Sequence, residues 1–111
     1  MQAGRLRHRV TIQQLVAGSP PQTETGEPNE VWADLATVWG SVEPLNGREL
    51  FAAQEHDSEV TVRIRVRYRA DVTHLMRVSF DSKIYDIRAV IDPQSMHREL
   101  QLLCTEGLNN G

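Results

Sequence analysis

The segment from Glu59 to Arg69 alternates apolar and polar residues without interruption. Side chains of a β-strand point to opposite faces with a period of two, so the pattern predicts a half-buried strand over about Ser58–Arg69. The core-facing residues of this strand would be Val60, Val62, Ile64, Val66 and Tyr68. The opposite face would carry a row that we call the arginine stripe, formed by Arg63, Arg65, Arg67 and Arg69.

Five further segments show strand patterns between turn signals. They are Leu6–Gln14, Val31–Glu43, Met76–Phe80, Lys83–Asp92 and Glu99–Glu106. In Lys83–Asp92 the alternation assigns one face to Tyr85, Ile87, Ala89 and Ile91, and the other to Ile84 and Val90. Six short strands in one small chain predict a mainly β fold, a six-stranded antiparallel β-barrel or sandwich.

The remaining segments carry turn, helix and chain-end signals. Ala17–Asn29 is rich in Pro, Gly, Ser, Thr and Glu, which predicts a long mobile hairpin loop. Leu45–Asp57 is predicted as a loop–helix insertion, because Arg48–Gln54 contains good helix formers after the Asn46-Gly47 break. The tail Gly107–Gly111 is predicted to fray.

Length and composition limit the fold to one domain over residues 1–111. No apolar run approaches the roughly 20 residues of a membrane span, so no membrane partner is expected. Cys104 is the only cysteine, which excludes an internal disulfide and favours a buried apolar role.

The sequence offers no pattern typical of catalysis or metal binding. The four histidines are scattered, and neither a CxxC, an HExxH nor a nucleophile elbow occurs. We therefore expect no catalytic residues, no metal and no cofactor, and a protein that is not an enzyme.

Charge is distributed unevenly along the chain. The net charge is −3, and acids concentrate in Glu24–Asp34 and Glu49–Glu59. Three interpretations of the arginine stripe stay open: a solvent face paired with acids of neighbouring strands, a subunit interface, or a nucleic-acid surface. At an interface the stripe would meet acids such as Glu24, Glu27 and Glu30 of a neighbour. The nucleic-acid interpretation lacks a stacking platform, since the patterns turn most aromatic residues inward.

An ordered set of segments resembles the head–tail joining proteins of long-tailed phages, also called head-closure or stopper proteins. The segments span nearly the whole chain and are Gly4–Gln13, Gly26–Pro28, Val31–Leu45, Gly47–Gln54, Thr61–Arg69, Met76–Asp81, Tyr85–Asp92 and Arg98–Cys104. The resemblance implies a small β-barrel that assembles as a ring, commonly twelvefold, beneath the portal and its adaptor. Such a ring closes the DNA-filled head and offers a docking surface to the tail.

The resemblance also implies partners, a location and a gate. The expected partners are further copies of the chain, the portal or adaptor, a tail-side terminator protein and DNA that passes through the channel without sequence recognition. The location would be the head–tail interface of the virion, after assembly in the bacterial cytoplasm. The candidate channel gate comprises Asn46, Gly47, Arg48, Glu49 and Gln54; a static helix that plugs one barrel end is the alternative. The competing functions are another neck or tail-completion component and a small OB-like nucleic-acid-binding barrel.

Overall fold

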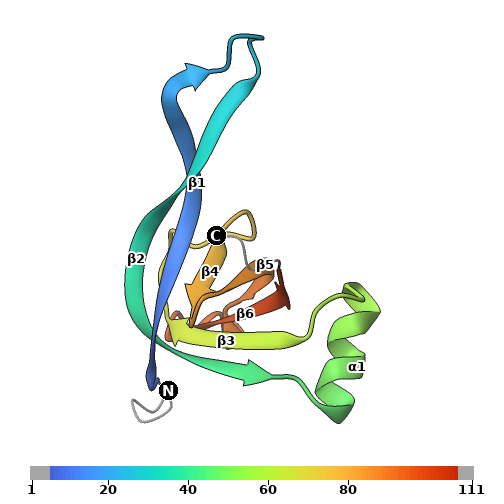
Figure 1. Ribbon diagram of the computed structural model, residues 1–111. Helices are drawn as coiled ribbons and strands as arrows, with labels where there is room; N and C mark the ends of the chain where they lie inside the picture. Colours follow the sequence, from blue (N-terminus) through green and yellow to red (C-terminus); the bar gives the residue numbers. More distant parts are fainter. Residues whose placement is uncertain (1–5, 108–111) are drawn as a thin grey trace.

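Six antiparallel strands close into a barrel, from which a long hairpin and a helix project (Figure 1). The computed structural model describes residues 6–107. The elements in chain order are β1 (His8–Gln22), β2 (Pro28–Pro44), α1 (Gly47–His56), β3 (Val62–Arg67), β4 (Arg77–Phe80), β5 (Lys83–Ile91), the 3-10 turn η2 (Pro93–Ser95) and β6 (Glu99–Glu106). The barrel order is β1-β2-β3-β6-β5-β4, and pairing of β1 with β4 closes it. The predicted mainly β fold with six strands and one short α-helix is confirmed.

The inward faces of the strands fill the barrel with apolar side chains. The most deeply buried members are Val10, Ile12, Val60, Ile64, Val66, Val78, Leu102 and Cys104. Ile64 of β3 lies opposite Leu102 of β6, and both are fully buried. The alternation in β3 therefore has the predicted orientation, with Ile64 and Val66 inside and the arginines outside. β3 itself is shorter than the predicted Ser58–Arg69, because it pairs regularly with its neighbours only over Val62–Arg67.

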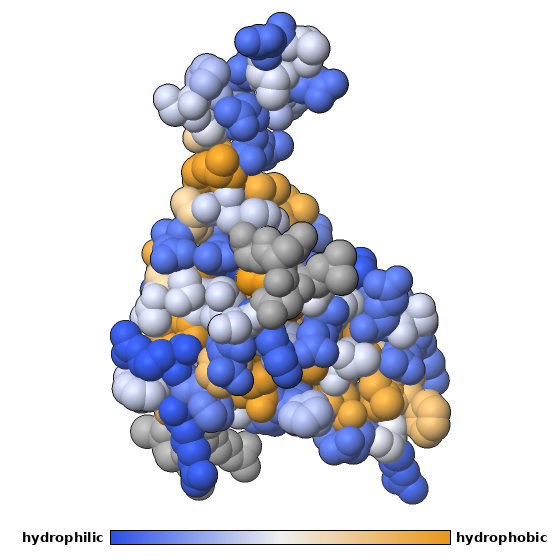
Figure 2. All heavy atoms as spheres, viewed as in Figure 1, coloured by the Kyte–Doolittle hydropathy of each residue, from blue (hydrophilic) through white to orange (hydrophobic). Residues whose placement is uncertain are grey.

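The outer part of the β1–β2 hairpin extends beyond the barrel (Figure 1). A third strand reaches β1 only at Thr11–Gln13 and β2 only at Gly40–Pro44, so the outer hairpin is a ladder of two strands. We call Leu15–Trp32 the hairpin arm; Leu15 pairs with Trp32 at its base. Figure 2 shows apolar side chains gathered where the arm leaves the barrel and hydrophilic side chains toward its tip.

The arm corrects the extent of the predicted loop Ala17–Asn29. β1 continues through Gln22 and β2 begins at Pro28, so the connecting turn occupies residues 23–27. Proline is tolerated here because a strand without a third neighbour needs no N–H on its outer side. The Asn29 side chain also donates to the Pro20 carbonyl at 2.7 Å, where the register of the ladder shifts.

A bulge in β5 changes which side chains face the core. The β5–β6 register shifts between Ile87 and Ala89, and each such shift exchanges the two faces of a strand. Ile87 is buried before the bulge, whereas Val90 packs against the core after it and Ile91 is 39% exposed. The prediction that Ala89 and Ile91 share a face with Ile87 is therefore wrong beyond the bulge.

Candidate assembly surfaces

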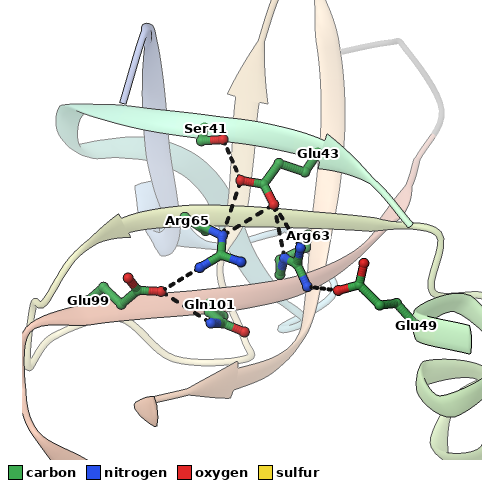
Figure 3. A network of polar contacts seen from close by, with 7 residues as sticks. All are labelled: Ser41, Glu43, Glu49, Arg63, Arg65, Glu99 and Gln101. Atoms are coloured by element: carbon green, nitrogen blue, oxygen red, sulfur yellow. Dashed lines mark hydrogen bonds and ion pairs between the residues drawn. The ribbon is translucent and has the colours of Figure 1, made fainter. Parts of the chain in front are cut away.

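Two members of the arginine stripe are bound by acids of their own chain (Figure 3). Glu43 on β2 lies opposite Arg63 on β3, and its carboxylate also contacts Arg65. The Arg63 Nη2–Glu43 Oε1 distance is 2.8 Å, and Arg65 Nη1 lies 3.0 Å from Glu99 Oε2 on β6. Arg63 further contacts Glu49 of α1. We call these residues, with Ser41 and Gln101, the Glu43 network.

Burial and hydrogen bonding shift the pKa values of Glu43 and Arg63 in opposite directions. The side chains of Arg63 and Arg65 are 15% and 16% exposed, and that of Glu43 is 27% exposed. Partial burial alone would raise the pKa of Glu43, but hydrogen bonds from Ser41, Arg63 and Arg65 outweigh it and lower the pKa. Burial would likewise lower the pKa of Arg63, while its bonds to Glu49 and Glu43 raise it. The geometry supports the interpretation in which these two arginines pair with neighbouring strands.

We expect Glu43→Gln to lower the free energy of unfolding by about 2 kcal/mol at pH 7, because hydrogen bonds to charged groups contribute about that much. Since the pKa of Glu43 is lowered in the folded state, the contribution is present above its ordinary value of 4.5 and is lost as the pH falls below it. The difference between wild type and variant should therefore shrink below that pH. Urea denaturation at several pH values measures it.

The matched control is Glu106→Gln. Glu106 pairs with Lys83 at 3.4 Å, but both side chains are about half exposed. Exposed pairs contribute about 0.2–1 kcal/mol. Equal losses in the two variants would contradict a stabilising role for the Glu43 network.

The other two members of the stripe behave differently. Arg69 lies just beyond β3 and forms a bidentate pair with Asp71 at 2.9 and 3.1 Å, which lowers the pKa of Asp71. The Arg67 side chain is exposed and makes no hydrogen bond or ion pair within residues 6–107. Arg63, Arg65 and Arg69 are thus paired within their own chain, and Arg67 is the stripe member that stays open to a partner.

Arg67 lines a groove of about 360 Å³, which we call the Arg67 groove. Its other lining residues are Arg9, Thr37, Val38, Trp39, Tyr68 and Arg69. Trp39 is 51% exposed, and the Arg9 guanidinium lies 4.9 Å from the centre of its ring. This contact was not predicted from the sequence; the signal that reveals it is the β1–β2 register, in which Arg9 lies opposite Trp39.

The three glutamates assigned to an interface lie on the hairpin arm. Glu24 and Glu27 belong to the turn, Glu30 to β2, and all three are exposed. None of them forms an ion pair with another residue of the described range 6–107. The structure does not bring them together with the arginine stripe of the same chain, since the arm extends away from the barrel (Figure 1).

The candidate gate residues lie at or on α1, beside the start of β3 (Figure 1). Asn46 precedes the helix in extended conformation, Gly47 has a positive φ of 55°, and Arg48 is exposed. Two side chains of α1 attach the helix to β3 and the segment before it: Glu49 contacts Arg63, and Gln54 Nε2 donates to the Val60 carbonyl at 3.2 Å.

The helix is not a plug of the barrel. No residue of α1 is buried, and Phe51 is 72% exposed. A plug would bury its apolar side chains against the core, whereas α1 presents Phe51 to solvent. Phe51 is therefore available to contact a partner.

The described residues contain no arrangement that suggests catalysis. No three His, Cys, Asp or Glu side chains in residues 6–107 could together hold a metal ion. His97 Nδ1 lies 2.5 Å from Asp92 Oδ2, but the histidine is 63% exposed. No helix within this part of the chain is long and apolar enough to cross a membrane.

Cys104 is expected to resist thiol reagents in the folded protein. Burial raises the pKa of its thiol to about 12, and its side chain is fully enclosed in the barrel. Because the thiolate is the reactive form, labelling by a maleimide at pH 8 should require unfolding. Mass spectrometry measures the reaction, with urea-unfolded protein as the control; rapid labelling without denaturant would contradict the burial.

Comparison with known proteins identifies the family. The sequence model of the phage head completion protein family matches residues 1–107. Head completion protein gp7 of Enterobacteria phage HK97 is 27% identical over 112 residues, which cover 96% of this chain and 97% of the relative. The solution structure of protein SF1141 from Shigella flexneri 2a is 31% identical, with a TM-score of 0.75 and coverage of 99% of this chain and 100% of that one.

A chain in the virion of a native gene transfer agent particle shares the fold. Its TM-score is 0.61 at 18% identity, and the likeness covers 95% of this chain and 97% of that one. The family match extends over the barrel, the arm and the helix alike. This chain therefore belongs to the phage head completion protein family.

Proposed function

We propose that this chain is a structural component of the phage neck, which forms a ring under the portal and adaptor and closes the DNA-filled head. The observation that carries the proposal is the family match over residues 1–107, together with HK97 head completion protein gp7 as a relative. In this function the ring also offers the surface to which the tail-side terminator docks. The protein would be built into virions at the head–tail interface after assembly in the host cytoplasm, and it would act without catalysis.

The shape of the chain supports ring formation. A ring built from one kind of subunit needs two different complementary surfaces on each copy. The hairpin arm and the barrel with α1 are such candidates, because both expose side chains that the barrel core does not use. At the base of the arm Leu15 and Val31 are 44% and 45% exposed, and on α1 Phe51 is 72% exposed. These exposed apolar residues fit surfaces that become covered on assembly.

The α1 insertion is the segment we propose to face the channel. Its attachment is polar: the 57%-exposed Glu49 contacts Arg63, and Gln54 donates to the Val60 carbonyl, while no residue of α1 is buried. The positive φ of Gly47 provides a hinge residue at its start. A segment held in this way can move while the barrel keeps its core, as a gate for passing DNA must.

Deletion of the gene from the phage genome that encodes it tests the function. We expect lysates with free tails beside heads that have released their DNA, as seen by negative-stain electron microscopy. The matched control restores the gene in trans from a plasmid. Normal virions from the deletion strain would overturn the proposal, and full heads with attached but defective tails would instead assign the chain to tail completion.

A further inference from the structure

We propose that the Arg67 groove of one copy binds the acidic tip of the hairpin arm of a second copy. The inference rests on the proposed ring and names the contact that would join its subunits. The groove offers two guanidinium groups without an ion pair in residues 6–107, those of Arg9 and Arg67. Trp39 supplies an exposed aromatic wall between them, with Arg9 placed over its ring. A cleft of this composition fits carboxylates carried on a narrow loop.

The arm tip has the complementary charge. Residues 17–31 contain three acids, Glu24, Glu27 and Glu30, and no Lys or Arg. The turn is narrow and internally braced, since the Thr23 amide donates to the Glu27 carbonyl and the Gly26 amide to the Thr23 carbonyl, both at 2.9 Å. A braced turn that presents carboxylates loses little conformational freedom on binding.

The groove and the tip of one molecule cannot meet. Arg9 and Trp39 of the groove lie on the same β1–β2 hairpin as the tip, but far along the ladder from the turn that carries it (Figure 1). At about 3.3 Å per residue, the ladder from Arg9 to the turn separates them by roughly 40 Å. The occupant must therefore be a second copy, and the contact joins unlike surfaces head to tail. Repeated contacts of this kind generate a closed ring or an open chain.

Arg63 and Arg65 of the arginine stripe are excluded from this contact. Arg63 and Arg65 are already paired with Glu43, Glu49 and Glu99 of their own chain. Binding a second set of carboxylates there would require breaking the pairs with Glu43 and Glu99, whose side chains are only 27% and 15% exposed. The proposal thus assigns Arg67 and Arg9, and not Arg63 or Arg65, to recognition of a neighbour.

The test is an intermolecular paramagnetic relaxation measurement on the full chain. Thr25→Cys carries a nitroxide on unlabelled protein, which is mixed with ¹⁵N-labelled wild type at about 1 mM, a concentration suited to millimolar affinities. Cys104 is buried and stays unlabelled. We expect selective broadening of the Trp39 indole and of the Arg67 and Thr37 amides. A nitroxide at exposed Ser58 is the control, and it should not broaden the Trp39, Arg67 and Thr37 signals more than the others.

Charge exchange then separates this contact from others. Arg9→Glu/Arg67→Glu and Glu24→Arg/Glu27→Arg should each lose the selective broadening when tested against themselves. A mixture of ¹⁵N-labelled Arg9→Glu/Arg67→Glu with nitroxide-tagged Glu24→Arg/Glu27→Arg should regain it, because the acidic groove of the observed copy then meets the basic tip of the tagged copy. Chemical shifts far from the changes verify that both variants fold.

The outcomes discriminate between occupants of the groove. Absence of selective broadening with wild type, or failure of the mixed variants to restore it, overturns the proposal. Groove signals that shift with a single-stranded oligodeoxynucleotide but not with the arm overturn it in favour of DNA. The contact and the neck function fail separately, since selective broadening beside a normal deletion phenotype would leave self-association without a role in head closure.

Discussion

Ile64→Ala is expected to lower the free energy of unfolding by about 3–4 kcal/mol, the range for a large side chain removed from a packed core. Ile64 is fully buried and lies opposite Leu102, at the junction of β3 and β6. Its removal leaves a cavity in the middle of a closed barrel, whose continuous hydrogen bonding restricts collapse around the gap. Since small domains are stable by about 5–15 kcal/mol, the loss is a large share of the total. Urea denaturation followed by tryptophan fluorescence measures it.

Two control variants make the interpretation specific. Ile64→Val removes one methylene and should cost about 1 kcal/mol. Ile91→Ala removes the same atoms as Ile64→Ala from a β5 side chain that is 39% exposed, and should cost much less. Equal effects of the alanine variants at positions 64 and 91 would contradict the placement of the core inside the barrel.

Phe51→Ser is expected to abolish plaque formation while leaving the isolated protein folded and as stable as wild type. Phe51 is 72% exposed on a helix without buried residues, so its removal takes no packing from the barrel. An aromatic anchor in an assembled interface contributes about 2 kcal/mol or more, which corresponds to roughly thirtyfold in the affinity of each contact. The loss of affinity is repeated at every subunit of a ring, so the assembled ring loses far more stability than a single contact does.

The measurement pairs thermal unfolding of the purified variant with plaque titre of a phage that carries the substitution. Ala52→Ser is the matched control, because it places the same hydroxyl at the adjacent exposed position of the same helix. It should leave both readouts near wild type. A normal titre with Phe51→Ser would remove α1 from the assembly surfaces.

Strand positions could be predicted from the sequence because one face of each strand is buried. Ile64 and Val66 alternate with arginines that must reach the outside, and only a strand separates the two sets. The helix was located by a different local signal, the good helix formers of Arg48–Gln54 after the Asn46-Gly47 break, and it is observed over Gly47–His56. These signals are local, so the fold class followed from them.

Features that depend on pairing between distant strands could not be predicted. The bulge between Ile87 and Ala89 is set by the β6 partner, and nothing in the alternation of Lys83–Asp92 marks it. The arm departs from expectation for a related reason: Pro20 and Gly18 are loop signals, but a two-stranded ladder accommodates both. The local sequence does not reveal that β1 and β2 continue past the barrel.

The partners of the charged side chains on the candidate surfaces also depend on pairing between distant strands. The arginine stripe was visible in the sequence, but only the registers of β2 and β6 show that Glu43 and Glu99 neutralise Arg63 and Arg65. The Arg9–Trp39 contact likewise follows from hairpin register. The sequence could therefore indicate a charged surface without separating the paired arginines, Arg63, Arg65 and Arg69, from the available Arg67.

In vitro complementation tests the neck function most directly. Freshly filled heads from the deletion strain receive purified protein, and the DNA that they protect from nuclease is measured before purified tails are added and plaques are counted. The account predicts that the wild-type chain restores both DNA retention and infectivity, and that Phe51→Ser restores neither. Heads that retain their DNA and accept tails without the chain would contradict it.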